Sequence, residues 1–457
     1  MSDRYDLIVL GGGPGGTAAA QEAAIRGMKV ALVEKSDIGG TCLNRGCVPT
    51  KMALHVAEIY RQARGAARFG MMGGEGLRME LSSFREYKED TLETLRQGMM
   101  NTMKKYGVDV ITGEGKIIDR GVVKINEKSY EAERILIAAG SVPAGIPVFG
   151  ADLPGVVSSD EMLEFETIPK KLVIIGGGVI GVEMAYLYSS FGSEVTLIES
   201  MKRLLVNLDR EIGRSIAQIL EKRGVEIHTS AMVEKICRDA VGMLNCMYEE
   251  KGEKKSAEGE TVLMATGRKA RVDGIFSKES AKLAETIKGE KGQIEVNENY
   301  ETAVSGIFAI GDVIGGIQLA HVAAAEGKNA VCAMVGEKPC INMESVPSCV
   351  YTDPEIASVG MSADEAKATG LKVVTRKYLM GANGKSVLSG QERGFIKVVV
   401  DPETERIAGA QMMCARATDM ITHFSQAMAS GLTLKDMAAI IYPHPTFCEA
   451  IGEVAAD

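Results

Sequence analysis

Several features that would point to other classes of protein are missing from this chain of 457 residues. An excess of basic residues is the first: the net charge is −9, whereas a face that binds nucleic acid must be basic. No apolar run reaches the roughly 18 residues that a membrane-spanning helix needs. An apolar segment starts almost at once, in "MSDRYDLIVLGGG", which leaves no room for a leader peptide. We therefore expect a cytoplasmic protein that binds neither nucleic acid nor membranes.

Metal-ligating side chains are also poorly clustered. Seven of the nine cysteines are scattered and would stay thiols in a reducing compartment: Cys237, Cys246, Cys332, Cys340, Cys349, Cys414 and Cys448. Only Cys42 and Cys47 form a local pair, in "GGTCLNRGCVPTK" (39–51). A structural zinc site needs four ligands, and the five histidines do not gather beside this pair. No metal is expected, and a redox-active disulfide is favoured over cysteines that only pack.

The backbone around this pair must bend if the two sulfurs are to join. A disulfide holds its Cα atoms roughly 4.4–6.8 Å apart, closer than residues five apart on a regular helix. Asn44 and Gly46 both tolerate unusual backbone angles and would permit the bend. Pro49 suits the first turn of a helix, so Cys47 is expected at a helix N-terminus, where the helix dipole favours a thiolate.

What the chain does contain is a repeat. "DLIVLGGGPGGTAAAQEAAIRGMKVALVEK" starts at Asp6, "KLVIIGGGVIGVEMAYLYSSFGSEVTLIES" starts at Lys171, and both predict strand, glycine turn, helix and strand. The residues in register are Gly11, Gly13, Gly16 and Glu34 in the first copy and Gly176, Gly178, Gly181 and Glu199 in the second. Such glycines make a tight turn, admit a pyrophosphate and let the helix pack on the strand. Tight strand–helix packing without a ligand is the alternative.

Two dinucleotide sites in one chain indicate electron transfer between two dinucleotides. Glu199 would repel a 2′-phosphate, so NAD(H) is favoured over NADP(H) in the second site, although Lys202 and Arg203 weaken this slightly. A further apolar strand, "SGIFAIGDVIGG", ends at Asp312, which can meet a cofactor hydroxyl or simply form a turn. From Cys340 onward, segments such as "GFIKVVVD" and "IAGAQMM" predict antiparallel strands followed by helices, a separate α+β unit.

These motifs, together with "HPTFCEA" near the end of the chain, resemble the FAD-dependent pyridine nucleotide–disulfide oxidoreductases from Tyr5 to Ala455. Within that family, "PSCVYTDPEIASVG" and "ANGKSVLSGQERGFIKVV" are most similar to the class I members that oxidise dihydrolipoamide. One departure is "AAG" at 138–140, where the family usually has "ATG".

The resemblance implies an α/β fold with two Rossmann-like dinucleotide-binding domains, one for FAD and one for NAD, and a C-terminal α+β dimerisation domain. The expected boundaries are 1–142 for the first part of the FAD domain, 143–268 for the NAD domain, 269–338 for the second, central part of the FAD domain, and 339–457 for the dimerisation domain. A homodimer is implied as well.

The resemblance also implies a role for individual residues. Those expected at FAD are Gly11, Gly13, Gly16, Glu34, Gly40, Thr41, Lys51, Gly115, Ala139, Gly140, Ser141, Asp312, Leu319, Ala320 and His321. Those expected at NAD are Gly176, Gly178, Ile180, Gly181, Glu183, Glu199, Val233 and Gly267. The implied catalytic residues are Cys42, Cys47, Lys51, Glu183, His444 and Glu449.

In the implied reaction, His444 of a second copy of the chain removes a proton from dihydrolipoamide and Glu449 orients the imidazole. The substrate attacks an outer Cys42, while an inner Cys47 faces the flavin, and Lys51 pairs with Glu183 near the nicotinamide. Plainer interpretations remain for some of these residues: solvated helix charges for Lys51 and Glu183, and a capping box for Thr446 and Glu449.

The implied activity is oxidation of dihydrolipoamide to lipoamide with NAD+. The implied partners are lipoyl domains of 2-oxo acid dehydrogenase complexes or the H protein of glycine cleavage. The alternative is a related NAD(P)H-dependent reductase of glutathione disulfide, coenzyme A disulfide or mercuric ion. Against it, glutathione reductases carry basic residues where Glu199 stands, and "EAIGEVAAD" lacks the terminal cysteine pair of mercury enzymes. A non-catalytic flavin-binding subunit is a rival of another class.

Overall fold

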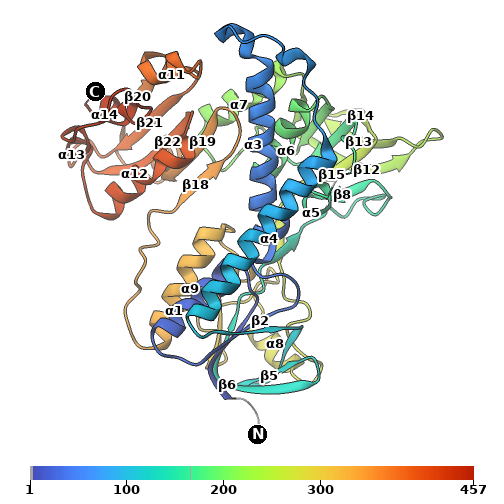
Figure 1. Ribbon diagram of the computed structural model, residues 1–457, viewed down its shortest axis with the longest axis vertical. Coiled ribbons are helices and arrows are strands. Elements are labelled where there is room, and N and C mark those ends of the chain that lie inside the picture. The colour runs from blue at the N-terminus through green and yellow to red at the C-terminus, as the bar shows by residue number, and fades with distance from the viewer. Residues whose placement is uncertain (1–3, 165, 457) are drawn as a thin grey trace. The chain divides into compact units, whose positions relative to one another are not determined.

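The computed structural model describes residues 4–164 and 166–456 (Figure 1). The chain divides into two compact units. The first comprises 1–52, 80–144 and 268–343, and the second comprises 53–79, 145–267 and 344–457. The four domain boundaries expected from the sequence stay a prediction. Among the described residues, no helix is long and apolar enough to cross a lipid bilayer.

The first unit is built on a seven-stranded sheet in the order β3-β2-β1-β6-β5-β4, with β17 also paired to β6. Its strands are β1 (Arg4–Leu10), β2 (Val30–Glu34), β3 (Asp109–Thr112), β4 (Gly115–Asp119), β5 (Val122–Ile125), β6 (Lys128–Ile137) and β17 (Ile307–Ala309). Strands β3, β2, β1, β6 and β17 run parallel. Both faces of β1 are buried, as is usual for a parallel strand covered on two sides: Leu7, Ile8 and Val9 are fully buried.

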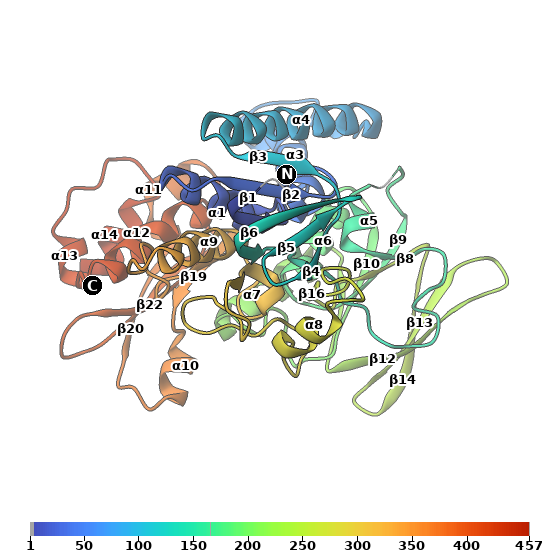
Figure 2. The same cartoon turned by 90° about the horizontal axis from the view of Figure 1, so that it is seen from below.

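Helices cover this sheet. They are α1 (Pro14–Ile25), α2 (Gly40–Arg45), α4 (Leu81–Lys105), α8 (Ala281–Ile287) and α9 (Ala320–Met334). Helices α1 and α9 lie side by side (Figures 1 and 2). Their close approach requires glycine at position 327. A Cβ atom there would lie 2.6 Å from the carbonyl oxygen of Gly15, nearer than any side chain permits. Alanine-rich α1 thereby packs between β1 and α9 as one apolar layer.

The second unit contains a parallel sheet in the order β11-β10-β9-β15-β8 and an antiparallel sheet β12-β13-β14 (Figure 2). Their bounds are β8 (Val156–Ser158), β9 (Lys171–Ile175), β10 (Glu194–Glu199), β11 (Glu226–Thr229), β12 (Ala231–Arg238), β13 (Leu244–Glu250), β14 (Glu253–Gly259) and β15 (Thr261–Met264). The accompanying helices are α5 (Ser159–Met162), α6 (Val179–Ser190) and α7 (Arg210–Lys222). Helix α3 (Cys47–Arg64) starts in the first unit and continues in the second.

The C-terminal part of the second unit has the antiparallel order β18-β19-β22-β21-β20. The expected strands are present at 395–400 and 407–414, among β18 (Pro347–Val350), β19 (Glu355–Gly360), β20 (Val374–Leu379), β21 (Phe395–Val400) and β22 (Ile407–Cys414). The helices are α10 (Ala363–Ala368), α11 (Gly384–Leu388), α12 (Ala417–Ala429), α13 (Leu434–Ala438) and α14 (Glu449–Ala456). Alternating buried residues of β21 and β22 pack against α12 and α14 in one core.

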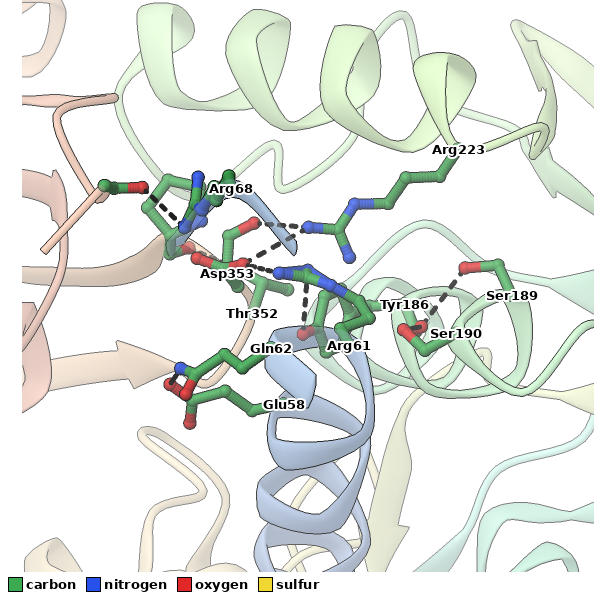
Figure 3. A network of polar contacts seen from close by, with 12 residues as sticks. Glu58, Arg61, Gln62, Arg68, Tyr186, Ser189, Ser190, Arg223, Thr352 and Asp353 are labelled. Atoms are coloured by element: carbon green, nitrogen blue, oxygen red, sulfur yellow. Dashed lines mark hydrogen bonds and ion pairs between the residues drawn. The ribbon is translucent and has the colours of Figure 1, made fainter. Parts of the chain in front are cut away.

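A polar cluster inside the second unit joins α3, α6, α7 and the loop before β19 (Figure 3). The Asp353 carboxylate pairs with Arg61, and its backbone carbonyl accepts a hydrogen bond from Arg223 at 3.0 Å. Arg61 donates to the Tyr186 hydroxyl at 3.2 Å, and the Arg223 guanidinium lies 4.5 Å from the centre of the Tyr186 ring. The cluster borders a cavity of about 990 Å³. No residue with a sequence-predicted role lines that cavity.

Candidate active and cofactor sites

The first glycine turn has the backbone geometry that its spacing predicts. Gly11 follows β1 with φ 113°, and a Cβ atom there would lie 2.3 Å from the carbonyl oxygen of Ala138. A Cβ atom at Gly16 would lie 1.9 Å from the carbonyl oxygen of Gly11. Only glycine permits the turn and the close packing of α1 against it.

The second glycine turn has nearly the same geometry, at the positions where the sequence repeats. Gly176 has φ 112°, and its Cβ atom would lie 2.4 Å from the carbonyl oxygen of Ala265. A Cβ atom at Gly181 would lie 1.8 Å from the carbonyl oxygen of Gly176. The two copies are therefore equivalent in three dimensions as well as in sequence.

The two strand-end carboxylates also have equivalent partners. Glu34 accepts hydrogen bonds from the amides of Gly12 at 2.7 Å and Ser36 at 2.9 Å. Glu199 accepts from the amides of Gly177 and, at 2.6 Å, Met201. Each carboxylate thus lies against its glycine turn, and an ionised carboxylate has about four acceptor positions. The remaining acceptor positions can accept hydrogen bonds from the hydroxyls of a ribose.

The helices that follow the turns have N-termini suited to a phosphate. Among the described residues, no side chain caps α1 after Gly13 or α6 after Gly178. The first amides of a helix have no partner within the helix and attract anions. With the glycine cradles and the strand-end carboxylates, both turns fit the pyrophosphate and ribose of a dinucleotide.

The cysteine segment is attached directly to the first glycine turn. The amide of Gly39 donates to the carbonyl oxygen of Gly12 at 2.8 Å. Gly40 has φ 58°, and a Cβ atom on it would lie 2.8 Å from the Cα atom of Gly13. This contact places Thr41 and Cys42, at the start of α2, beside the turn of the first dinucleotide site.

Cys42 and Cys47 lie in thiol–thiol contact. Cys42 belongs to α2 and Cys47 begins α3, the helix N-terminus expected for it. The hydrogen bond between the thiols, followed by burial, raises the pKa of the Cys42 thiol. The proton is therefore held on Cys42 when the pair is reduced.

One expectation for this segment needs correction. Gly46, with φ −139° and ψ −110°, separates the two helices, but Asn44 is helical and only its side chain contributes, donating to the carbonyl oxygen of Gly40 at 2.9 Å. The backbone of Asn44 can stay helical because Gly46 alone breaks the helix. Cys42 is half-buried and Cys47 is exposed. Which of the two sulfurs faces the substrate and which faces the flavin stays a prediction.

The remaining residues expected at FAD lie in the same unit. Gly115 begins β4 and its Cβ atom would lie 2.8 Å from the Leu10 side chain, at the end of β1. Ala139 and Gly140 form the turn after β6, and Leu319 precedes Ala320 and His321 in the first turn of α9. Lys51 lies in the first turns of α3.

Ser141 and Asp312 are hydrogen-bonded to each other at 2.5 Å. Ser141 begins β7 (Ser141–Pro143), which pairs with β16 (Arg268–Ala270). Arg268 donates to the Ser141 hydroxyl at 2.8 Å, a contact that sequence reasoning missed. The only sign of this contact in the sequence is an arginine directly after "ATG" in "ETVLMATGRKA". Nothing in the sequence indicates that β7 pairs with β16.

A partly buried carboxylate beside Asp312 was also missed. Glu326 of α9 accepts a hydrogen bond from the amide of Gly311 at 2.6 Å. Burial raises the pKa of the Glu326 carboxyl, and the nearby charge of Asp312 raises it further. The carboxyl fixes the Gly311 backbone and so positions Asp312.

In the second unit, Ile180, Gly181 and Glu183 lie in the first turns of α6. Glu183 is 3% exposed and accepts a hydrogen bond from the amide of Tyr351 at 2.9 Å. Val233 lies in β12, and Gly267, with φ 106°, ends the segment after β15. The expected pairing of Glu183 with Lys51 stays a prediction.

His444 and Glu449 form a pair in the second unit. The Nδ1 atom of His444 lies 2.8 Å from Oε1 of Glu449, and the imidazole side chain is 79% exposed. The other carboxylate oxygen accepts from the amide of Thr446 at 2.8 Å. The amide of Thr446 and then the His444 ring lower the pKa of the Glu449 carboxyl. An ionised Glu449 therefore orients the ring and leaves Nε2 available to a substrate.

The capping-box interpretation of Glu449 is half correct. The carboxylate does reach back to the Thr446 amide, as a capping box requires. The Thr446 hydroxyl donates to the carbonyl oxygen of Pro443 at 2.8 Å. One carboxylate thus shapes the loop and holds the histidine.

Comparison with known proteins agrees with this geometry. A family model described as pyridine nucleotide-disulphide oxidoreductase matches residues 5–327, and one for the dimerisation domain of the same family matches residues 346–455. This chain belongs to the pyridine nucleotide-disulphide oxidoreductases. Membership brings with it FAD and a pyridine nucleotide as cofactors, and the dimerisation domain supports a homodimer.

Relatives in this oxidoreductase family match along their whole length. A dihydrolipoyl dehydrogenase of Bacillus subtilis (strain 168) is 38% identical, covering 100% of this chain and 98% of its own. One from Staphylococcus aureus is 34% identical, covering 98% of this chain and 96% of its own. A solved structure, the Cu(II) complex of the HOCl-induced flavoprotein disulfide reductase RclA from Escherichia coli, superposes with a TM-score of 0.87 at 27% identity and 99% coverage of both chains.

Proposed function

We propose that this chain is a dihydrolipoyl dehydrogenase, which oxidises dihydrolipoamide to lipoamide with NAD+ as electron acceptor. The observation that carries the proposal is the thiol pair Cys42–Cys47 attached to a dinucleotide-binding glycine turn. Full-length relatives named dihydrolipoyl dehydrogenase support the choice of substrate.

The residues of the chain have separate tasks in this reaction. Starting from the Cys42–Cys47 disulfide, His444 of a second copy takes a proton from one substrate thiol, which attacks the Cys42 sulfur while Cys47 leaves as a thiolate. The second substrate thiol then displaces Cys42 and closes the lipoamide disulfide. Of the two protons that the substrate loses, one ends on Cys42 and the other stays on His444, which releases it to solvent. The electron pair now resides in Cys42 and Cys47.

Cofactor binding divides between the two glycine turns. The first turn, Glu34, the Ser141–Asp312 pair and the segment at Leu319 would hold FAD, whose chemistry when bound is to pass the electron pair from a thiolate to a nicotinamide. The exposed Cys47 is the sulfur that a flavin ring would cover. The second turn would hold NAD, and Lys51 with Glu183 would lie near the nicotinamide.

Choice of NAD over NADP rests on Glu199. Glu199 is 8% exposed and is the last residue of β10, beside the second glycine turn. A 2′-phosphate placed there would meet this negative charge. Lys202 and Arg203 stand nearby in sequence, but Arg203 is engaged by the backbone carbonyls of Leu205 and Leu208 at 3.0 and 2.9 Å.

The partners follow from the substrate. Dihydrolipoamide is carried by lipoyl domains of 2-oxo acid dehydrogenase complexes or by the H protein of glycine cleavage, so a cytoplasmic homodimer serving one of these systems is part of the proposal. The alternative is a related NAD(P)H-dependent disulfide reductase, favoured by the structural similarity to a flavoprotein disulfide reductase.

A comparison of electron acceptors tests the proposal. The FAD-loaded protein should oxidise NADH with lipoamide far faster than with glutathione disulfide or coenzyme A disulfide, and faster with NADH than with NADPH. Dihydrolipoamide should reduce NAD+ in the reverse assay. Preference for another disulfide, or for mercuric ion, would support the alternative reductase. Flavin binding without turnover of any acceptor would indicate a non-catalytic subunit.

A further inference from the structure

A second pair of thiols lies close together at the end of α9, in the first unit. Cys332 is fully buried in the last turn of the helix, and Cys340 is an exposed residue in the segment that follows it. Burial, followed by the interaction with the neighbouring Cys332 thiol, raises the pKa of the Cys340 thiol. Among the described residues, the same kind of thiol–thiol contact links Cys42 and Cys47.

The segment after α9 is held in place by Asn329, one turn before Cys332 on the same helix. Its side chain donates to the carbonyl oxygen of Ile341 at 2.9 Å and accepts from the amide of Ile341 at 2.9 Å. The Cys340 thiol lies 3.6 Å from the same Asn329 oxygen. Asn329 is 2% exposed. These bonds fold the chain back over the helix and keep the two sulfurs together without a covalent link.

A cation lies beside the buried sulfur. Arg26, which follows α1, donates a hydrogen bond to the Cys332 sulfur at 3.2 Å. The same guanidinium pairs with Glu22 and, at 3.0 Å, with Glu337. A charged donor of this kind compensates the negative charge that a sulfur bears when it attacks or leaves in thiol–disulfide exchange.

We propose that Cys332 and Cys340 form a second, reversible dithiol–disulfide centre whose oxidant is a low-molecular-weight disulfide. The exposed Cys340 thiol loses its proton and attacks one sulfur of the disulfide RSSR, forming a Cys340–SR bond and releasing RS−. Cys332 then loses its proton, attacks the Cys340 sulfur and expels the second RS−. The two thiol protons end on the two leaving thiolates, so one RSSR becomes two RSH and the protein gains one disulfide.

The contacts around the pair explain why exchange would stop at an internal bridge. An external thiol reaches Cys340 but not the buried Cys332, so only Cys340 is attacked from outside. Once Cys340 carries an adduct, the neighbouring Cys332 sulfur is the nucleophile beside it. The bridge would fasten the segment 338–343 to α9, which also carries the residues expected at FAD in its first turn.

Another neighbouring cysteine pair provides a matched control. Cys237 and Cys246 lie on the adjacent strands β12 and β13, but Cys237 pairs with Asn245 and Cys246 with Ile236. Side chains of successive strand residues leave opposite faces, so these two thiols point away from each other. Cys237 donates instead to the carbonyl oxygen of Asn245 at 3.8 Å.

Peptide mapping of the full-length, FAD-loaded protein tests the proposal. The protein is incubated with glutathione disulfide, its free thiols are blocked, and it is cleaved after glutamate. Cleavage at Glu326, Glu337 and Glu344 places Cys332 and Cys340 in different peptides, 327–337 and 338–344. We expect these peptides to be disulfide-linked in the wild type and in Cys237→Ser, and the link to be lost in Cys340→Ser.

Cys332→Ser should retain glutathione on Cys340, and if this buried substitution prevents folding, Cys340→Ser still decides the question. Addition of reduced glutathione should open the wild-type link. A stable glutathione adduct on wild-type Cys340, a link from Cys340 to any other cysteine, or no reaction at either residue would overturn the proposal. Since the readout is a peptide and not turnover, it is independent of the proposed lipoamide activity.

Discussion

The sulfur atoms of Cys42 and Cys47 decide the chemistry at the residue scale. Their contact keeps the proton on Cys42, because a second charge beside a thiolate is disfavoured and Cys42 is partly buried. Gly46 alone produces the bend that brings the two residues together. The chemistry of the pair thus depends on a break between two helices that a single glycine supplies.

Replacement of Cys47 by serine should abolish lipoamide turnover. Serine cannot form the disulfide or carry the thiolate, so the long-wavelength absorbance expected from a thiolate against a flavin should also be lost. Steady-state assays and absorbance spectra of the FAD-loaded variant measure both effects. Cys237→Ser is the control and should leave them unchanged, while full turnover in Cys47→Ser would exclude this sulfur from the reaction.

Replacement of His444 by glutamine should separate the two half-reactions. General acid–base catalysis is worth about 10²- to 10⁴-fold in rate, so lipoamide reactions should slow by that order. Transfer from NADH to an artificial dye bypasses the thiols and should be nearly unchanged. Equal losses in both assays would show that His444 does not act in the thiol step.

At the scale of elements, much of the architecture could be predicted from the sequence. Apolar runs followed by glycine turns correctly located β1, α1, β9 and α6, since local spacing alone sets such turns. Strand pairing between distant segments could not be predicted, as with β7 and β16, which bring Arg268 to Ser141. The Cys332–Cys340 contact was missed for a related reason: it depends on a chain reversal fixed by Asn329.

The polar cluster around Asp353 is expected to stabilise the second unit. Replacing Asp353 by asparagine removes the charge that Arg61 and Arg223 share, and burial followed by the charge of Arg61 already lowers the pKa of Arg223. A hydrogen bond to a charged group contributes about 1.5–3 kcal/mol. The free energy of unfolding should therefore fall by about that amount, and the melting temperature should fall with it.

Asp364→Asn provides the matched control for this cluster. Its pair with Arg210 is 3.6 Å long with side chains 56% and 69% exposed, and such surface pairs contribute about 0–1 kcal/mol. In thermal unfolding, the melting temperature of Asp353→Asn should therefore lie clearly below that of Asp364→Asn. Equal melting temperatures for Asp353→Asn and the wild type would show that the cluster is not a stabilising element.

At the scale of the whole molecule, the repeat explains why one chain handles two dinucleotides. Each glycine turn, helix N-terminus and strand-end carboxylate occurs twice with nearly the same geometry. The sequence also predicted antiparallel strands followed by helices after Cys340, in the part of the chain that matches the family's dimerisation domain. Which of the two sulfurs, Cys42 or Cys47, faces the flavin stays a prediction.

The most direct test of the account is an anaerobic titration of the FAD-loaded protein with one equivalent of dihydrolipoamide. Free thiols are then blocked and the peptides that contain Cys42 and Cys47 are quantified. We predict that both cysteines become thiols in step with lipoamide formation and that added NAD+ returns them to the disulfide. Lipoamide formation and NAD+ reduction while Cys42 and Cys47 stay oxidised, or stay reduced throughout, would contradict the account.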